Sequence, residues 1–69
     1  MIEVFRTNVD CKDAAGQLLN LLLKSFPHVM INFDLEDCDK ILRVEANTID
    51  CDKIIHLVNE QGYQCEILE

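Results

Sequence analysis

The chain has 69 residues, which suffices for one small domain with a single hydrophobic core. Hydrophobic residues make up 49% of it, a share that argues against disorder. The 13 acidic and 6 basic residues give a net charge of −7, which disfavours binding to nucleic acid or to anionic membranes. We therefore expect cations or a basic protein surface as ligands.

The N-terminal segment, residues 2–8, predicts a short strand. It contains Ile2, Val4 and Phe5, with polar residues between and after them. Asp10 follows where this pattern breaks, and aspartate is a favoured N-cap residue. The sequence therefore predicts that a helix begins directly after Asp10.

Residues 11–25 predict a helix that buries one face. Its apolar residues recur at the helical spacing i, i+3, i+4 and i+7: Ala15, Leu18, Leu19, Leu22 and Phe26. Leu21 and Leu23 widen this stripe, either as a broader core contact or as an apolar patch for a partner. Pro27 ends the helix, because the residue before a proline is biased out of the α region.

Two strands joined by a short polar link are predicted next. Residues 29–35 alternate, with four apolar side chains on one side: Val29, Ile31, Phe33 and Leu35. Residues 41–46 alternate in the same way, with Leu42, Val44 and Ala46 on one side. The short link predicts an antiparallel hairpin.

A second helix and a last strand complete the pattern. Asp50 predicts the N-cap of a helix that runs to about Gln61, and Gly62 predicts its end. The apolar side of this helix is formed by Cys51, Ile54, Ile55 and Val58. Residues 63–68 predict a strand, with Tyr63, Cys65 and Ile67 on one side.

The order strand–helix–strand–strand–helix–strand predicts an α+β fold in one domain, residues 1–69. Two right-handed crossovers around a hairpin give the ferredoxin-like βαββαβ sandwich, a four-stranded antiparallel sheet of order 4-1-3-2 with two helices on one face. The other face is the expected surface for a protein partner or a homodimer, and we expect it to carry Phe5, Asn32, Asp34, Arg43 and Glu45. The two edge strands, residues 29–35 and 63–68, offer a second route to a homodimer.

The second half of the chain resembles the heavy-metal-associated (HMA) domain family. Leu42 to Glu45, Asp50 to Ile55 and Gln61 to Leu68 are similar to that family's closing pattern of a strand, a capped helix and a Gly-Tyr step into the last strand. Phe26-Pro27-His28-Val29 also resembles the stretch before the family's second strand. The resemblance implies the ferredoxin-like fold together with metal binding or metal transport.

The family's metal motif, Met-x-Cys-x-x-Cys, lies between the first strand and the first helix. Here Cys11 matches its first cysteine, whereas Val9 replaces the methionine and Ala14 the second cysteine. Two thiolates at i and i+3 give soft coordination of monovalent copper, which one thiolate alone cannot give. Two hypotheses follow: a metal-handling module with an atypical site at Cys11, or a protein-interaction module that has lost metal binding.

The predicted topology brings three connections to one end of the domain: the loop that carries Cys11, the hairpin that carries Cys38 and the Gly62-Tyr63 step. We expect a transition-metal site there, with oxygen donors from the neighbouring aspartates: Asp10 and Asp13, with Asp37 or Asp39 as further candidates. Thiolate and carboxylate ligands together suit zinc. Against this site, two strand spacings of about 4.8 Å each separate the two thiols.

The four cysteines are expected to be free thiols or metal ligands. The first residues lack the basic flank and cleavage site of a secretory signal, so a small acidic cytoplasmic protein is expected. No apolar run approaches the roughly 20 residues of a membrane span. Cys51 and Cys65 are expected to pack as small hydrophobic residues. His28 is expected at the opposite end from Cys11, so no general base is expected there and the sequence predicts no enzyme.

Overall fold

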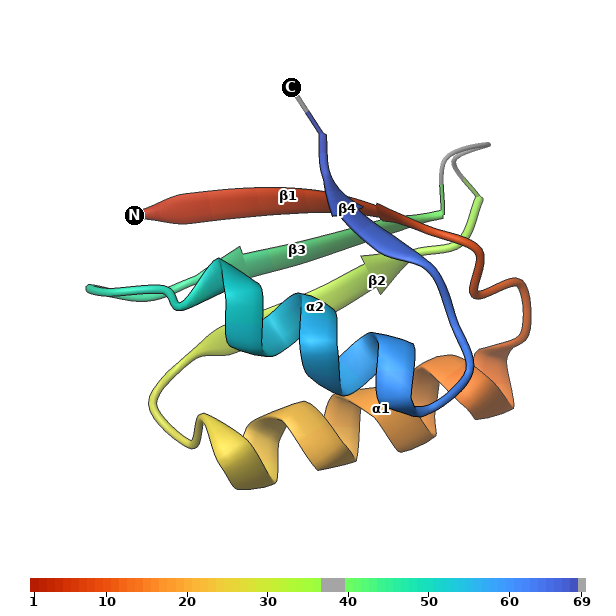
Figure 1. Ribbon diagram of the computed structural model, residues 1–69, viewed down its shortest axis with the longest axis horizontal. Coiled ribbons are helices and arrows are strands. Elements are labelled where there is room, and N and C mark those ends of the chain that lie inside the picture. Colours follow the sequence, from red (N-terminus) through yellow and green to blue (C-terminus); the bar gives the residue numbers. More distant parts are fainter. Residues whose placement is uncertain (37–39, 69) are drawn as a thin grey trace.

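The structure, a computed structural model, describes residues 1–36 and 40–68. Its elements follow the predicted order: β1 (Ile2–Thr7), α1 (Lys12–Ser25), β2 (Met30–Asp34), β3 (Ile41–Glu45), α2 (Cys51–Glu60) and β4 (Cys65–Ile67). The strands form one antiparallel sheet in the order β2-β3-β1-β4, and both helices lie on the same face of it (Figure 1). This arrangement confirms the predicted ferredoxin-like fold.

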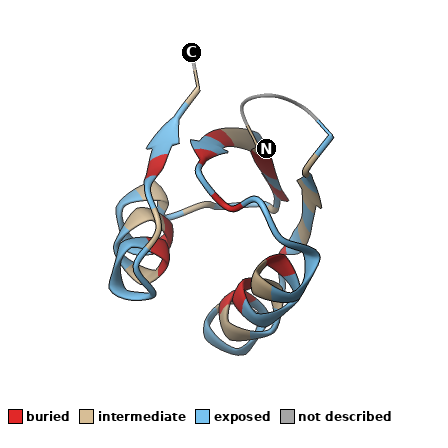
Figure 2. Cartoon of the chain, turned by 90° about the vertical axis from the view of Figure 1, so that its right-hand side faces the viewer, coloured by how far each residue is buried: buried red, intermediate tan, exposed pale blue. Residues whose placement is uncertain are grey.

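The core lies between the sheet and the helices and consists of two clusters of buried side chains (Figure 2). The larger cluster contains Phe5, Leu22, Val29, Leu42, Val44, Ile54, Val58 and Cys65. The smaller one, where β1 passes into α1, contains Val9, Ala15 and Leu18. Phe33 and Tyr63 pack against both clusters and join them.

The helix ends confirm one predicted N-cap and correct the other. Oδ1 of Asp50 accepts a hydrogen bond from the backbone N–H of Lys53 at 3.2 Å, so α2 begins where predicted. Gly62, at φ +92°, supplies the left-handed conformation that ends α2. The prediction for α1 was wrong, because Cys11 and not Asp10 is its N-cap, and the Cys11 side chain makes no capping hydrogen bond.

The side chains of β1 face the opposite way from the prediction. Phe5 is fully buried opposite Leu42, so its predicted place on the outer face of the sheet was wrong. Burying the phenyl ring removes far more apolar surface from water than burying a smaller neighbour would. Thr7 shares this inward side, and its hydroxyl donates to the Lys40 carbonyl (2.6 Å) and accepts from the Val9 N–H (3.2 Å). The inward polar residue is therefore satisfied.

The apolar stripe predicted for α1 is present, and part of it is exposed to solvent. Leu18 and Leu22 are buried, Leu21 is half-buried, and Leu23 is 39% exposed. Leu23 therefore belongs to the surface rather than to the core. In the part of the chain that the structure describes, no helix is both long enough and apolar enough to cross a membrane.

Candidate functional site

Three connections meet at one end of the domain, as the topology predicted, at the right of Figure 1. The Thr7 hydroxyl bonds to the Lys40 carbonyl and so ties the end of β1 to the start of β3. The N–H of Gln64, after α2, donates to Oδ1 of Asn8, before α1, at 2.7 Å. The loop that resembles the family's metal loop is therefore held in place from both sides.

The predicted ligands in this loop are exposed side chains. The backbone carbonyl of Cys11 accepts from the Ala15 N–H at 3.0 Å, so the main chain begins the helix without using the thiol. Asp10, Cys11 and Asp13 are all exposed. Over residues 1–36 and 40–68, no three His, Cys, Asp or Glu side chains form a group that could hold a metal ion.

The rest of the predicted site lies outside the described residues. Cys38, the second proposed thiolate, and its neighbours Asp37 and Asp39 belong to the segment 37–39. The structure therefore places one thiolate and two carboxylates of the predicted set and brings no further described ligand to them.

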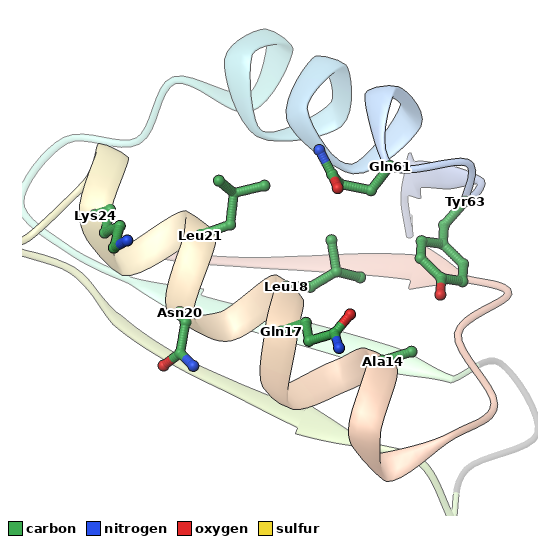
Figure 3. A pocket seen from close by; sticks show the side chains of 8 residues that line it. All are labelled: Ala14, Gln17, Leu18, Asn20, Leu21, Lys24, Gln61 and Tyr63. Carbon is green, nitrogen blue, oxygen red and sulfur yellow. The ribbon is translucent and has the colours of Figure 1, made fainter.

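The other two positions of the family's motif are apolar here and face the core. Val9 is fully buried and packs with Ala15 and Leu18. Ala14 packs against the same cluster and lines a groove with Tyr63 (Figure 3). The residues that replace the methionine and the second cysteine thus contribute to packing.

Cys65 is a buried thiol on β4, as predicted. It lies opposite Thr7 of β1, is 8% exposed and belongs to the larger core cluster. Burial, followed by the charges of Cys51 and Glu66, raises the pKa of the Cys65 thiol to about 12. Cys65 is therefore protonated at neutral pH and packs as a small apolar side chain.

Cys51, the first residue of α2, is half-buried against the same cluster. Burial raises the pKa of its thiol, and the carboxylates of Glu3, Asp52 and Asp50 add to this effect. The protonated form is favoured, which agrees with the packing role predicted for Cys51.

The sheet face away from the helices is uncovered by any described element (Figure 2). The strand register arranges its side chains in rows that run from β2 through β3 to β1: Met30–Glu45–Ile2, then Asn32–Arg43–Val4, then Asp34–Ile41–Arg6. Four residues predicted for this face are present and exposed, namely Asn32, Asp34, Arg43 and Glu45. At its charged end, Arg6 pairs with Glu66 at 3.4 Å.

The opposite end of this face carries an apolar corner, formed by Ile2 and Met30 on the face itself and by Met1, which lines a hollow together with Met30. These side chains are 66%, 57% and 70% exposed, and the register places Ile2 and Met30 on either side of Glu45. The sequence analysis did not identify this corner. The sequence feature that could have identified the corner is Met30, an apolar residue on the polar side of its strand.

Two grooves flank α1. The groove between α1 and α2 has a volume of about 360 Å³, and four of its eight lining side chains are polar or charged: Gln17, Asn20, Lys24 and Gln61 (Figure 3). The groove between α1 and the edge of β2 is larger, about 650 Å³, and its inner wall contains Leu19, Phe33 and Leu35. Half of the lining side chains of the second groove are also polar or charged, so its difference from the first groove is its greater room.

Comparisons with protein-family models, with curated proteins and with solved structures found no match for this chain. The ferredoxin-like fold is compatible with the HMA family, and no family match confirms membership.

Proposed function

We propose that this domain is a protein-interaction module that binds its partner through the outer face of the sheet. The apolar corner of Met1, Ile2 and Met30 carries this proposal. Single exposed apolar residues are common on proteins, whereas several at one end of an uncovered face, here with Glu45 between Ile2 and Met30, are typical of contact surfaces. The net charge of −7 favours a partner with a basic surface.

The test compares partner capture by the wild type and by an Ile2→Thr/Met30→Thr variant. Extract from the source cells is passed over each immobilised protein, and bound proteins are quantified by mass spectrometry. We expect the variant to lose the specifically captured protein. Both side chains are more than half exposed, so the free energy of unfolding should change by less than about 0.5 kcal/mol.

Leu23→Thr is the matched control, since it removes an exposed apolar side chain from α1 on the other side of the domain. It should capture the same protein as the wild type. Equal capture by all three proteins, or equal loss in both variants, would contradict a binding surface at the apolar corner.

Metal handling at Cys11 is the second candidate function. The thiol is exposed, takes no part in capping the helix and has the carboxylates of Asp10 and Asp13 nearby in the sequence. This is the observation that favours it, since a soft sulfur ligand beside oxygen donors suits zinc, and a thiolate suits monovalent copper. Cys38 is the proposed second thiolate.

Titration of the reduced protein with Zn(II) and with Cu(I), each against a competing chelator, tests this candidate. If Cys11 is a ligand, the wild type should bind more tightly than about micromolar and the Cys11→Ser variant should lose that binding. Cys51→Ser is the control. Cys51 begins α2 at the end of the domain away from Cys11, so its replacement should leave metal binding intact. The absence of chelator-resistant binding in the wild type would exclude metal handling.

A further inference from the structure

Among the residues that the structure describes, no strand pairs with the outer edge of β2, which ends the sheet on one side. The N–H of Ala46 donates to the carbonyl of Met1 at 3.0 Å, which fixes the residues of β3 whose backbone groups face β1. In an antiparallel ladder these groups alternate, so the β3 residues between them bond to β2. Their partners in β2 are Met30, Asn32 and Asp34. The N–H and C=O groups of Ile31 and Phe33 therefore point outward, away from the sheet.

The groove of about 650 Å³ lies directly beside this edge. Its walls are Ala15, Gly16 and Leu19 of α1, and Phe33 and Leu35 beside β2. Gly16 keeps the groove wide, since no atom lies within 4 Å of the place where a Cβ would be. A strand added to β2 would direct every second side chain to the helical face of the sheet, and hence into this groove.

The charge of the chain indicates the occupant. The charged side chains that line the groove cancel, with Lys12 and Arg43 against Asp34 and Glu36. The net charge of the whole chain, −7, therefore determines which occupant is favoured. It disfavours a second copy of this acidic chain and favours a basic segment. The groove between the helices is smaller, and none of its lining residues belongs to a strand (Figure 3).

We infer that β2 is a strand-addition site. An extended basic segment of a partner protein pairs with the outward backbone groups of Ile31 and Phe33 and places alternate apolar side chains in the groove beside Gly16. This inference rests on the proposed function as a protein-interaction module and gives that module a defined peptide site. Backbone pairing provides affinity, and the groove selects the side chains.

A phage-displayed library of random peptides, selected on the immobilised wild-type protein, provides the probe. We expect enrichment of basic peptides that alternate apolar and polar residues. The binding of a selected synthetic peptide is then measured by fluorescence anisotropy against two variants. Gly16→Leu fills the groove and should weaken binding at least about 10-fold. Gln17→Leu adds an apolar side chain facing the other groove and should leave binding unchanged.

Amide hydrogen exchange supplies a readout of the backbone pairing itself. Exchange at Ile31 and Phe33 should slow when the peptide binds, because their N–H groups gain acceptors. Gly16→Leu removes a glycine from a helix, and a Cβ at this position has no atom of another element within 4 Å, so the variant should remain folded. Its circular dichroism spectrum and melting curve verify this.

Three outcomes would overturn the inference. They are a selection that enriches no peptide, peptide binding that is equal in Gly16→Leu and the wild type, and unchanged exchange at Ile31 and Phe33. A dimer of the wild type that Gly16→Leu dissociates would assign the edge to a second copy instead. The Ile2→Thr/Met30→Thr variant should still bind the peptide, so a failure of the strand site is distinguishable from a failure of the apolar corner.

Discussion

Replacing Phe5 with alanine is expected to leave most of the protein unfolded in the absence of denaturant. Phe5 is fully buried in the larger core cluster and lies opposite Leu42 in the centre of the sheet. Truncation of a buried phenylalanine costs about 3–5 kcal/mol. A single core in a chain of this size rarely supplies more than about 3–5 kcal/mol in total. Far-UV circular dichroism and urea titration measure the loss.

Two further variants test whether the loss of stability in Phe5→Ala results from the burial of this side chain. Phe5→Leu keeps an apolar side chain in the core and should cost less than Phe5→Ala while leaving the protein folded. Met30→Ala truncates a side chain that is 70% exposed and should leave the urea midpoint almost unchanged. If Phe5→Ala unfolded at the same urea concentration as the wild type, Phe5 would lie on the outer face, as the sequence had suggested.

The strands and helices could be predicted from the sequence wherever the apolar residues follow a single periodicity. The alternation of residues 29–35 and 41–46 has a single apolar phase, and Asp50 and Gly62 mark both ends of α2. In β1, by contrast, Ile2 and Val4 occupy one phase and Phe5 the other. Burial of Phe5 decides between them, and the inward Thr7 is satisfied by a hydrogen bond to Lys40, 33 positions away. Local pattern cannot report such a contact.

The candidate site was predictable only as far as the topology defines it. The prediction that three connections meet at one end is confirmed by two bonds, from Gln64 to Asn8 and from Thr7 to Lys40. The identity of the N-cap was not predictable, because Asp10 and Cys11 are adjacent and the loop geometry decides between them. The apolar corner was missed because Ile2 joins Met30 on the outer face only through the phase of β1, which the pattern of residues 2–8 leaves ambiguous.

Raising the pH above about 9 is expected to destabilise the protein through Cys65. Its pKa is about 12 in the folded state, against an ordinary value of 9.0. Between these values the folded chain keeps the proton and the unfolded chain releases it, so unfolding is favoured as the pH rises. The thiol has no such effect below pH 9.0, where both states are protonated. The free energy of unfolding should fall by up to about 1.4 kcal/mol per pH unit.

Urea titrations from about pH 8 to about pH 11 on the wild type and on a Cys65→Val variant measure this fall. Valine is apolar, somewhat larger than cysteine and favoured in strands, so the variant should fold at neutral pH. Its alkaline fall should be distinctly smaller than that of the wild type, with a remainder from Cys51, whose pKa is also raised. The same fall in both proteins would mean that Cys65 ionises in the folded state near its ordinary pKa, which would require water to reach a thiol that is only 8% exposed. β4 would then have to separate readily from β1, because the pairing of Cys65 with Thr7 is what closes that edge of the core.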